Sequence, residues 1–401
     1  MAQTALLLAA MLGASAPSAA QPSLADTTSA EHLVQLGRQH LKAGTEGDVD
    51  QAIRLFHAAL AANLDCVSAL VGLSGAHRIQ APWDGGDRRG IDLAIALGEK
   101  ATFLAPDDPD AHLALGEAYL AKRWYRQAAP HFQRVQDLRP DADAAYSLGW
   151  IATEMGDYVA ASAWYDRAFA LDSTHSGLLL EIGATARTLG DYVRAADVLR
   201  RGLEAHPDDA ALNANLVLLF VQQGKTAEAV GHGARLIERA PENVDFLTTA
   251  ATANWYAGHA EAAASLFARA MEEAEGEDPF IGWWGTYTST ALGDLYTRAG
   301  RHDNGKPMLD GSEAGYVARL REAGEGWGYL YDLARVHAAR GERDEALRWL
   351  RRAVRFGFPE VYLAKVDPMM VALREDPEYE RVLTELEGRI REMRARAQGR
   401  R

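Results

Sequence analysis

The chain has 401 residues, of which 48% are hydrophobic, 24% charged and only 8% aromatic. Its 42 Lys and Arg stand against 56 Asp and Glu, which gives a formal net charge of −14. This acidic balance argues against nucleic acid as a partner, because most of the surface repels a phosphate backbone. The single cysteine, Cys66, excludes an intramolecular disulfide. With no Lys or His beside it to lower its pKa, we expect it to pack as a small apolar residue.

The N-terminal segment is typical of a secretory signal peptide. Apolar residues run from Ala5 to Ala14, too few for a transmembrane helix, which needs about twenty. Small residues at positions 18 and 20 fit cleavage before Gln21, although the first four residues lack the usual Lys or Arg. We therefore predict a signal peptide over residues 1–20, a linker over 21–28, and a periplasmic or secreted location.

A unit of 34 residues recurs in the middle of the chain. Leu148-Gly149 and the later Gly156-Asp157-Tyr158 return as Ile182-Gly183 and Gly190-Asp191-Tyr192. A fixed period of this length indicates stacked supersecondary units. Two apolar segments of helical period flank each Gly-Asp pair, where Gly can end one helix and Asp can cap the next. Each unit is therefore expected to be a helix hairpin.

The same spacing extends along most of the chain. With the Gly of the Leu-Gly pair as position 8, that position reads Gly37, Ser74, Gly116, Gly149, Gly183, Val217, Ala251, Gly293 and Ala334. Position 20 reads Ala52, Ala94, Ala128, Ala161, Ala195, Ala229, Ala263, Gly305 and Ala346, and position 27 is also mostly small. Seven of the nine copies keep twelve residues between positions 8 and 20.

These residues resemble the tetratricopeptide repeat, a 34-residue helix-turn-helix unit with a Leu-Gly pair, two later Ala positions and a closing Pro. The closing Pro stands at Pro106, Pro140, Pro207 and Pro241. The resemblance implies an all-α protein, a right-handed α-solenoid of about nine hairpins, over residues 29–355. The family consists mostly of binding scaffolds whose partners vary, so the resemblance does not name a ligand.

Three stretches depart from the regular repeat. An insertion over 81–90 carries Pro and Gly and predicts a projecting loop, in which we expect Trp83 to fold back onto its own hairpin rather than to contact a partner. Residues 271–284 add an acidic turn that permits repeat eight to tilt. The second helix of repeat eight contains four residues that are unfavourable within helices: Asn304, Gly305, Pro307 and Gly311.

Residues 356–401 form a tail after the ninth repeat. Its Asp367-Pro368 and Asp376-Pro377 turns resemble the tail that closes many bacterial repeat proteins of this family. Because a terminal repeat leaves one apolar side without a neighbour, we expect the tail to be a helical cap. The Arg-rich end, Arg389 to Arg401, is interpreted as a solvated helix end, in preference to an anchor for an anionic surface.

The chain shows no sequence motif for catalysis. It contains no Gly-rich phosphate loop, no His-Glu-x-x-His pair and no Gly-x-Ser-x-Gly elbow. The 12 His are scattered, and the spacing of Asp84, Asp87 and Asp92 does not match a calcium loop. We therefore predict no enzyme activity, no cofactor and no metal.

The resemblance also implies a binding groove. In the family, the first helix of each hairpin lines the concave face through positions 2, 5, 9, 12 and 13. The residues predicted to line it are Leu113, Glu117, Tyr146, Trp150, Leu180, Arg187, Trp255, Tyr256, Asp294, Arg298, Tyr331 and Arg335. Aromatics beside isolated charges suit an extended peptide. Alternatively, Tyr146, Trp150 and Tyr256 simply pack between neighbouring helices.

The preferred hypothesis is an exported scaffold that binds a partner protein or peptide in this groove. Some family members grip a C-terminal carboxylate with Lys and Asn, but Leu113, Tyr146 and Leu180 stand at the matching positions, so that mode is not expected. The alternative is a carbohydrate or cell-wall binding module, because aromatic faces stack on sugars. Neither the identity of the partner nor the oligomeric state follows from the sequence.

Overall fold

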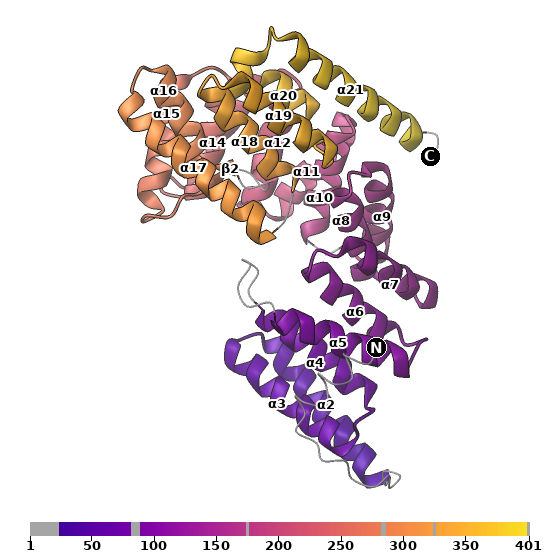
Figure 1. Ribbon diagram of the computed structural model, residues 1–401. Helices are drawn as coiled ribbons and strands as arrows, with labels where there is room; N and C mark the ends of the chain where they lie inside the picture. Colours follow the sequence, from indigo (N-terminus) through magenta and orange to yellow (C-terminus); the bar gives the residue numbers. More distant parts are fainter. Residues whose placement is uncertain (1–23, 82–88, 174–175, 282–285, 324–325, 399–401) are drawn as a thin grey trace. The chain divides into compact units, whose positions relative to one another are not determined.

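The structure is a computed structural model that describes residues 24–81, 89–173, 176–281, 286–323 and 326–398 (Figure 1). The predicted signal peptide and the loop residue Trp83 lie outside this part of the chain. No helix within the described ranges has the length and apolar character needed to cross a membrane. The chain divides into two compact units, here called unit 1, Met1–Ile151, and unit 2, Ala152–Arg401.

Unit 1 consists of helix hairpins. Its helices are α2 (Leu24–Ala43), α3 (Glu46–Ala62), α4 (Val67–Gln80), α5 (Arg89–Leu104), α6 (Pro109–Ala121) and α7 (Tyr125–Leu138), followed by α8 (Ala142–Glu154), which ends in unit 2. Helix α2 packs on α3, α4 on α5, and α6 on α7. Helix α2 begins at Leu24, inside the segment predicted as a linker. The linker prediction is therefore wrong from that residue on, since residues 24–28 contain neither Gly nor Pro to stop the helix.

Unit 2 continues the hairpins and ends in the tail. Its helices are α9 (Tyr158–Leu171), α10 (Ser176–Thr188), α11 (Tyr192–Ala205), α12 (Ala210–Gln222), α13 (Thr226–Arg239), α14 (Val244–Tyr256), α15 (Ala260–Glu273), α16 (Thr288–Arg298), α17 (His302–Ala323), α18 (Trp327–Ala339) and α19 (Arg343–Arg355). The tail contains α20 (Val361–Val366), the 3-10 helix η1 (Pro368–Leu373) and α21 (Pro377–Gln398). The predicted all-α repeat solenoid is confirmed.

The repeated small residues explain why the hairpins close. Gly190 ends α10 with a φ of 72°, a left-handed conformation that Gly adopts without a steric penalty. The side chain of Asp191 then accepts a hydrogen bond of 3.2 Å from the backbone N–H of Arg194, as predicted for a helix cap. The position-20 alanines are all 0% exposed where the helices cross: Ala52, Ala94, Ala128, Ala161, Ala195, Ala229, Ala263 and Ala346.

A two-stranded hairpin follows α15, where the sequence analysis expected only an acidic turn. Strand β1 (Phe280–Ile281) pairs antiparallel with β2 (Thr286–Tyr287). The hydroxyl of Thr286 donates a 2.9 Å hydrogen bond to the carboxylate of Asp332 on α18. This bond links the extra segment to the ninth repeat.

Helix α17 is continuous for 22 residues although it contains the unfavourable residues named above. Close packing compensates at Gly305. A Cβ there would lie 2.6 Å from the carbonyl oxygen of Gly293 and 2.4 Å from the hydroxyl of Thr297 on α16. The helix backbones therefore approach at this point more closely than any residue with a side chain allows, and tertiary packing overrides the low helix propensity.

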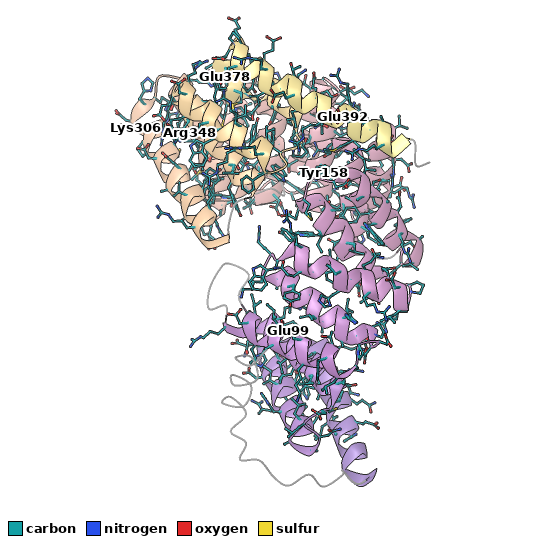
Figure 2. All side chains as sticks on the ribbon, turned by 45° about the vertical axis from the view of Figure 1, so that its right-hand side comes forward. Glu99, Tyr158, Lys306, Arg348, Glu378 and Glu392 are labelled. Atoms are coloured by element: carbon teal, nitrogen blue, oxygen red, sulfur yellow. The ribbon has the colours of Figure 1, made fainter. Side chains whose placement is uncertain are left out.

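The tail packs against both ends of unit 2. Its apolar side chains form one cluster with Leu347 and Leu350 of repeat nine and with Tyr158 and Leu189 near the beginning of the unit. In Figure 2, Glu378 and Glu392 mark the two ends of α21, and Tyr158 belongs to α9, which α21 contacts.

A contact between two glycines accompanies this packing. Gly156 and Gly357 have φ values of 76° and 94°, and a Cβ on Gly156 would lie 3.4 Å from the Cα of Gly357. The end of repeat nine therefore touches the turn between α8 and α9, and the backbone conformation at both positions favours glycine.

Candidate functional site

The candidate site in unit 2 is the face formed by the first helices of its hairpins, α10, α12, α14, α16 and α18. Residues 358–373, here called the tail segment, contact all five helices. The segment comprises the residues before α20, α20 itself and η1. We call the surface that it covers the unit 2 groove.

The first polar anchor of the tail segment is Glu360. Its two carboxylate oxygens accept hydrogen bonds of 2.9 and 2.7 Å from Nη1 and Nη2 of Arg187 on α10. Thr188 and, from α12, Gln222 donate further bonds of 3.3 and 2.9 Å. The side chains of Arg187 and Glu360 are 0% and 6% exposed, so this bidentate ion pair is fully removed from water.

The second polar anchor is Asp367, which begins η1 by accepting a 2.9 Å hydrogen bond from the backbone N–H of Met369. Its other oxygen accepts a 2.8 Å bond from the hydroxyl of Tyr331 and lies 3.0 Å from Nε of Arg335. Burial lowers the pKa of Arg335, but the carboxylates of Asp367 and Asp332 outweigh it and raise that pKa well above its usual value. The guanidinium therefore stays charged within the protein interior.

Apolar side chains of the tail segment fill the space between these anchors. The ring of Phe358 stacks on Tyr331 with 4.2 Å between centroids. Leu363 enters a cluster with Val217 of α12 and Ala253 of α14, and Met369 enters the cluster around Trp255. The segment thus brings two acidic side chains and several apolar ones to the groove, and most of its residues lie in α20 and η1.

The unit 2 groove contains most of the predicted groove residues, and the chain's own tail segment covers it. Arg187, Tyr331 and Arg335 contact the segment directly, and Arg298 donates a hydrogen bond to the carbonyl oxygen of Pro368. These side chains are therefore engaged within the chain in this conformation.

Four predicted residues of unit 2 lie in packing arrangements beside the segment. Trp255 is 3% exposed and packs edge-on against Phe267, and Leu180 lies against a separate cluster around Leu199. Burial raises the pKa of Tyr256, and it raises that of Asp294 to about 6 although Arg298 lies 2.9 Å away. Tyr256 is partly buried and packs against the cluster that contains Leu363 of the tail segment.

Unit 1 carries a corresponding set of side chains that remain partly exposed. Arg78 on α4 pairs with Glu117 on α6 at 3.1 Å, with 26% and 33% of the two side chains exposed. Burial raises the pKa of Glu117 in spite of the nearby Arg78 guanidinium. Leu113, Tyr146 and Trp150 are also partly exposed. We call Arg78, Leu113, Glu117, Tyr146 and Trp150 the unit 1 face.

The repeat register relates the unit 1 face to the unit 2 groove. Arg78 stands at position 12, as does Arg187, and Tyr146 stands at position 5, as does Tyr331. In stacked repeats, equal positions occupy equivalent places on each hairpin. The unit 1 face therefore presents an arginine and a tyrosine at the same places on their hairpins as Arg187 and Tyr331, two repeats apart in unit 1 and four repeats apart in unit 2.

Sequence reasoning missed four contributors to these surfaces. Arg78 and Gln222 occupy positions 12 and 13, so the position rule was sufficient to find them. Glu360 and Asp367 carried no such signal, because nothing local indicates that a tail carboxylate meets an arginine of repeat five or nine. The Asp367-Pro368 pair was interpreted only as a turn.

The chemistry of these surfaces is that of binding. Among the described residues, no three or more His, Cys, Asp or Glu side chains gather as a metal site. His112 and His131 form a pair at 3.0 Å within the hairpin of α6 and α7, and burial lowers the pKa of His131 to about 4. Arginines, hydroxyls and apolar side chains are arranged to hold carboxylates and hydrophobic groups.

The fold and these surfaces define a class of protein, an α-solenoid of helix hairpins. Comparison with known families gives a tetratricopeptide repeat match over residues 42–81, 113–175 and 180–244, and a second one over 330–361. The chain belongs to the tetratricopeptide repeat family. Proteins of this family are generally interaction scaffolds and are typically not enzymes.

Solved structures with similar folds come from several organisms. The pilF protein of Pseudomonas aeruginosa is 16% identical with a TM-score of 0.47, covering 55% of this chain and 96% of that one. A tetratricopeptide repeat protein from Parabacteroides merdae is 16% identical, with a TM-score of 0.45 and coverages of 61% and 93%. Yeast Tom70 is 13% identical, with a TM-score of 0.47 and coverages of 89% and 92%. A search of curated proteins finds no match.

Proposed function

We propose that this protein is an exported interaction scaffold whose unit 1 face binds an extended segment of a partner protein. The observation that carries the proposal is the unit 2 groove, which already holds the tail segment through Arg187 and Tyr331. The unit 1 face presents an arginine and a tyrosine at the same repeat positions, and all five of its side chains are partly exposed. Peptide capture in a groove of this kind relies on apolar pockets with a few fixed charges.

Site-specific photo-crosslinking in the native cell tests this proposal. A photo-reactive residue at Leu113 should crosslink to a partner, whereas one at Phe103, which is 80% exposed on α5, should not. Trp150→Ala should reduce the yield at position 113 while the melting temperature changes little. Equal crosslinking at the two positions, or a yield that Trp150→Ala leaves unchanged, would contradict a partner site on this face.

Export is the second part of the proposal, and it is supported by the apolar run and the small residues before Gln21. N-terminal sequencing of the protein purified from its native cells should find a chain that begins at or near Gln21. Recovery of a chain that retains Met1 or Ala2 would remove this part of the proposal and leave the binding part intact.

Carbohydrate binding is the alternative, and one feature of unit 1 favours it. Trp124, 41% exposed, stacks on Tyr119 with 6.0 Å between centroids, and the Lys122 ammonium lies 4.2 Å from its ring centroid. An exposed aromatic face of this kind can stack on a sugar ring. A pull-down with envelope polysaccharide decides the matter: retention that Trp124→Ala abolishes supports the alternative, and no retention excludes it.

A further inference from the structure

We propose that the unit 2 groove is a recognition site for an acidic, apolar segment of a partner protein, and that the chain's own tail segment occupies it until such a partner displaces it. This site is separate from the unit 1 face. Loss of binding at either one therefore leaves the other measurable, and the two proposals fail independently.

The charges in the groove point to recognition as well as capping. Arg187 and Arg335 are 0% and 3% exposed; Glu360 of the tail segment pairs with Arg187, and Asp367 of the segment pairs with Arg335 together with Asp332 of α18. Removing an ion pair from water costs about as much as the pair returns, and apolar residues of similar volume often stabilise a protein more. If the segment served only as a cap, apolar side chains in place of these ion pairs would stabilise the protein at least as well. The paired charges instead make the groove selective for carboxylates at two fixed places.

The elements on both sides of the tail segment keep contacts of their own that do not involve the groove. On its outer side, Val366 and Val371 are 40% and 47% exposed, whereas α21 contacts α20 and the Tyr379 hydroxyl donates a 2.8 Å hydrogen bond to the carbonyl oxygen of Ala364. Displacement of the segment therefore also breaks its contacts with α21. Before it, Phe356 and Gly357 form a short turn after α19, and after it α21 packs on α19 and α9. A displaced segment therefore stays tethered at both ends and can return.

The chemistry of the partner follows from the anchors that the groove already accommodates. An aromatic residue comes first, as Phe358 does, and an acidic residue two positions later meets Arg187. A leucine-sized residue follows at the place of Leu363, and an Asp seven positions after the first acid meets Arg335. A Met-sized apolar residue just beyond that Asp completes the pattern.

A competition experiment on the full chain tests the proposal, with a fluorescent peptide of residues 356–374 as the probe. The double variant Glu360→Gln with Asp367→Asn weakens the resident segment and leaves every residue of the five groove helices unchanged. We expect it to bind the peptide at least tenfold more tightly than the unchanged chain does. The matched control is Glu375→Gln with Glu385→Gln, two exposed acids of the tail, which should bind the peptide as weakly as the unchanged chain.

A second peptide with Gln and Asn in place of the two acids checks the chemistry. It should bind the double variant at least tenfold more weakly than the acidic peptide. Equal binding of the two peptides, or equal binding of the acidic peptide by all three chains, overturns the proposal. The first outcome would show that the groove does not select carboxylates. The second would show that weakening the tail segment does not free the groove.

Amide exchange of the unchanged chain gives a test that does not depend on how well the double variant folds. An excess of the acidic peptide should accelerate exchange in residues 361–373, because displacement exposes their backbone groups to water. Exchange in α14, whose helical hydrogen bonds remain intact, should not accelerate. If the excess peptide leaves residues 361–373 as protected as before, the segment is a permanent part of the fold and the proposal is wrong.

Discussion

Arg187 and Glu360 lie 173 residues apart in the chain, yet both terminal nitrogens of the arginine donate hydrogen bonds to the two carboxylate oxygens. The pair joins repeat five directly to the tail. In a solenoid each repeat normally contacts only its neighbours, so this bond adds a connection that the repeat pattern lacks. The stability of unit 2 therefore depends on the tail as well as on hairpin stacking.

Breaking this ion pair should destabilise unit 2 strongly. Arg187→Ala leaves the Glu360 carboxylate buried without its charged partner, which costs about 3 to 5 kcal/mol. The control is Arg78→Ala, which breaks a partly exposed pair and should cost about 1 kcal/mol or less. Urea denaturation followed by circular dichroism measures both. Equal losses would show that the buried pair contributes no more than a surface one.

Replacing both partners of the pair by apolar residues should restore much of the lost stability. The double variant Arg187→Met with Glu360→Leu leaves no buried charge unpaired, so it should be more stable than Arg187→Ala by about 2 kcal/mol or more. The same urea titration reports this difference. A double variant no more stable than Arg187→Ala would assign the loss to packing instead of to the unpaired charge.

The buried carboxyl of Glu181 should make unit 2 less stable at alkaline pH. Burial raises its pKa from 4.5 to about 7, and its carboxylate accepts a 3.3 Å hydrogen bond from the Tyr165 hydroxyl. The pKa of Glu181 is higher in the folded state than in the unfolded state. The stability that its protonated carboxyl contributes is therefore complete below about pH 4.5 and is lost as the pH rises through about 7.

Glu181→Gln keeps the shape of the side chain and removes its titration. Relative to the unchanged protein, this variant should gain about 2.5 kcal/mol of stability between pH 5 and pH 8, which is most of the free-energy equivalent of the shift. Urea unfolding at several pH values measures the difference. A difference that stays constant with pH would show that the carboxyl titrates normally in the folded state.

Two glycines of α17 should respond in opposite ways to alanine. A Cβ at Gly305 would lie 2.6 Å from the Gly293 carbonyl oxygen, so Gly305→Ala should force the helices apart and cost about 1 to 3 kcal/mol. No atom lies within 4 Å of a Cβ at Gly311, so Gly311→Ala should stabilise the helix by up to about 1 kcal/mol. Thermal unfolding of the pair of variants tests this. A stabilising Gly305→Ala would mean that α16 and α17 do not pack so closely.

Two tryptophans predicted to line one groove should behave differently. Trp255 is 3% exposed and packs on Phe267, so Trp255→Ala should cost about 3 to 5 kcal/mol of stability. Trp150 is partly exposed on the unit 1 face, so Trp150→Ala should cost much less. Chemical denaturation compares the two variants directly. A larger loss for Trp150 would place it in the core and support the packing alternative for that face.

The hairpins could be predicted from the sequence because their causes are local. The Gly and Asp of each turn and the Ala at position 20 recur at a fixed period, and each acts within its own hairpin. Likewise, the position rule assigned Arg187, Tyr331 and Arg335 to a shared surface. These features required no knowledge of distant parts of the chain.

The occupant of that surface could not be predicted in this way. Contacts such as Tyr331 with Phe358 or Arg335 with Asp367 join repeat nine to a tail with no periodicity of its own. The short pairing of β1 with β2 was missed for a related reason, since strands of two residues are too brief to show alternation. Local patterns determine the hairpins, whereas tertiary contacts determine what covers them.

The separation of Arg187 from Glu360 also has a consequence for synthesis. Ribosomes add about 5 to 20 residues per second, so the 173 residues between them take roughly 10 to 35 s to appear. Repeat five can fold as soon as it emerges, because its contacts are with adjacent repeats. Until the tail is made, its arginine has no carboxylate to meet, and the nascent chain presents a cationic, apolar surface. Chaperones and early partners therefore encounter a surface that the finished protein covers.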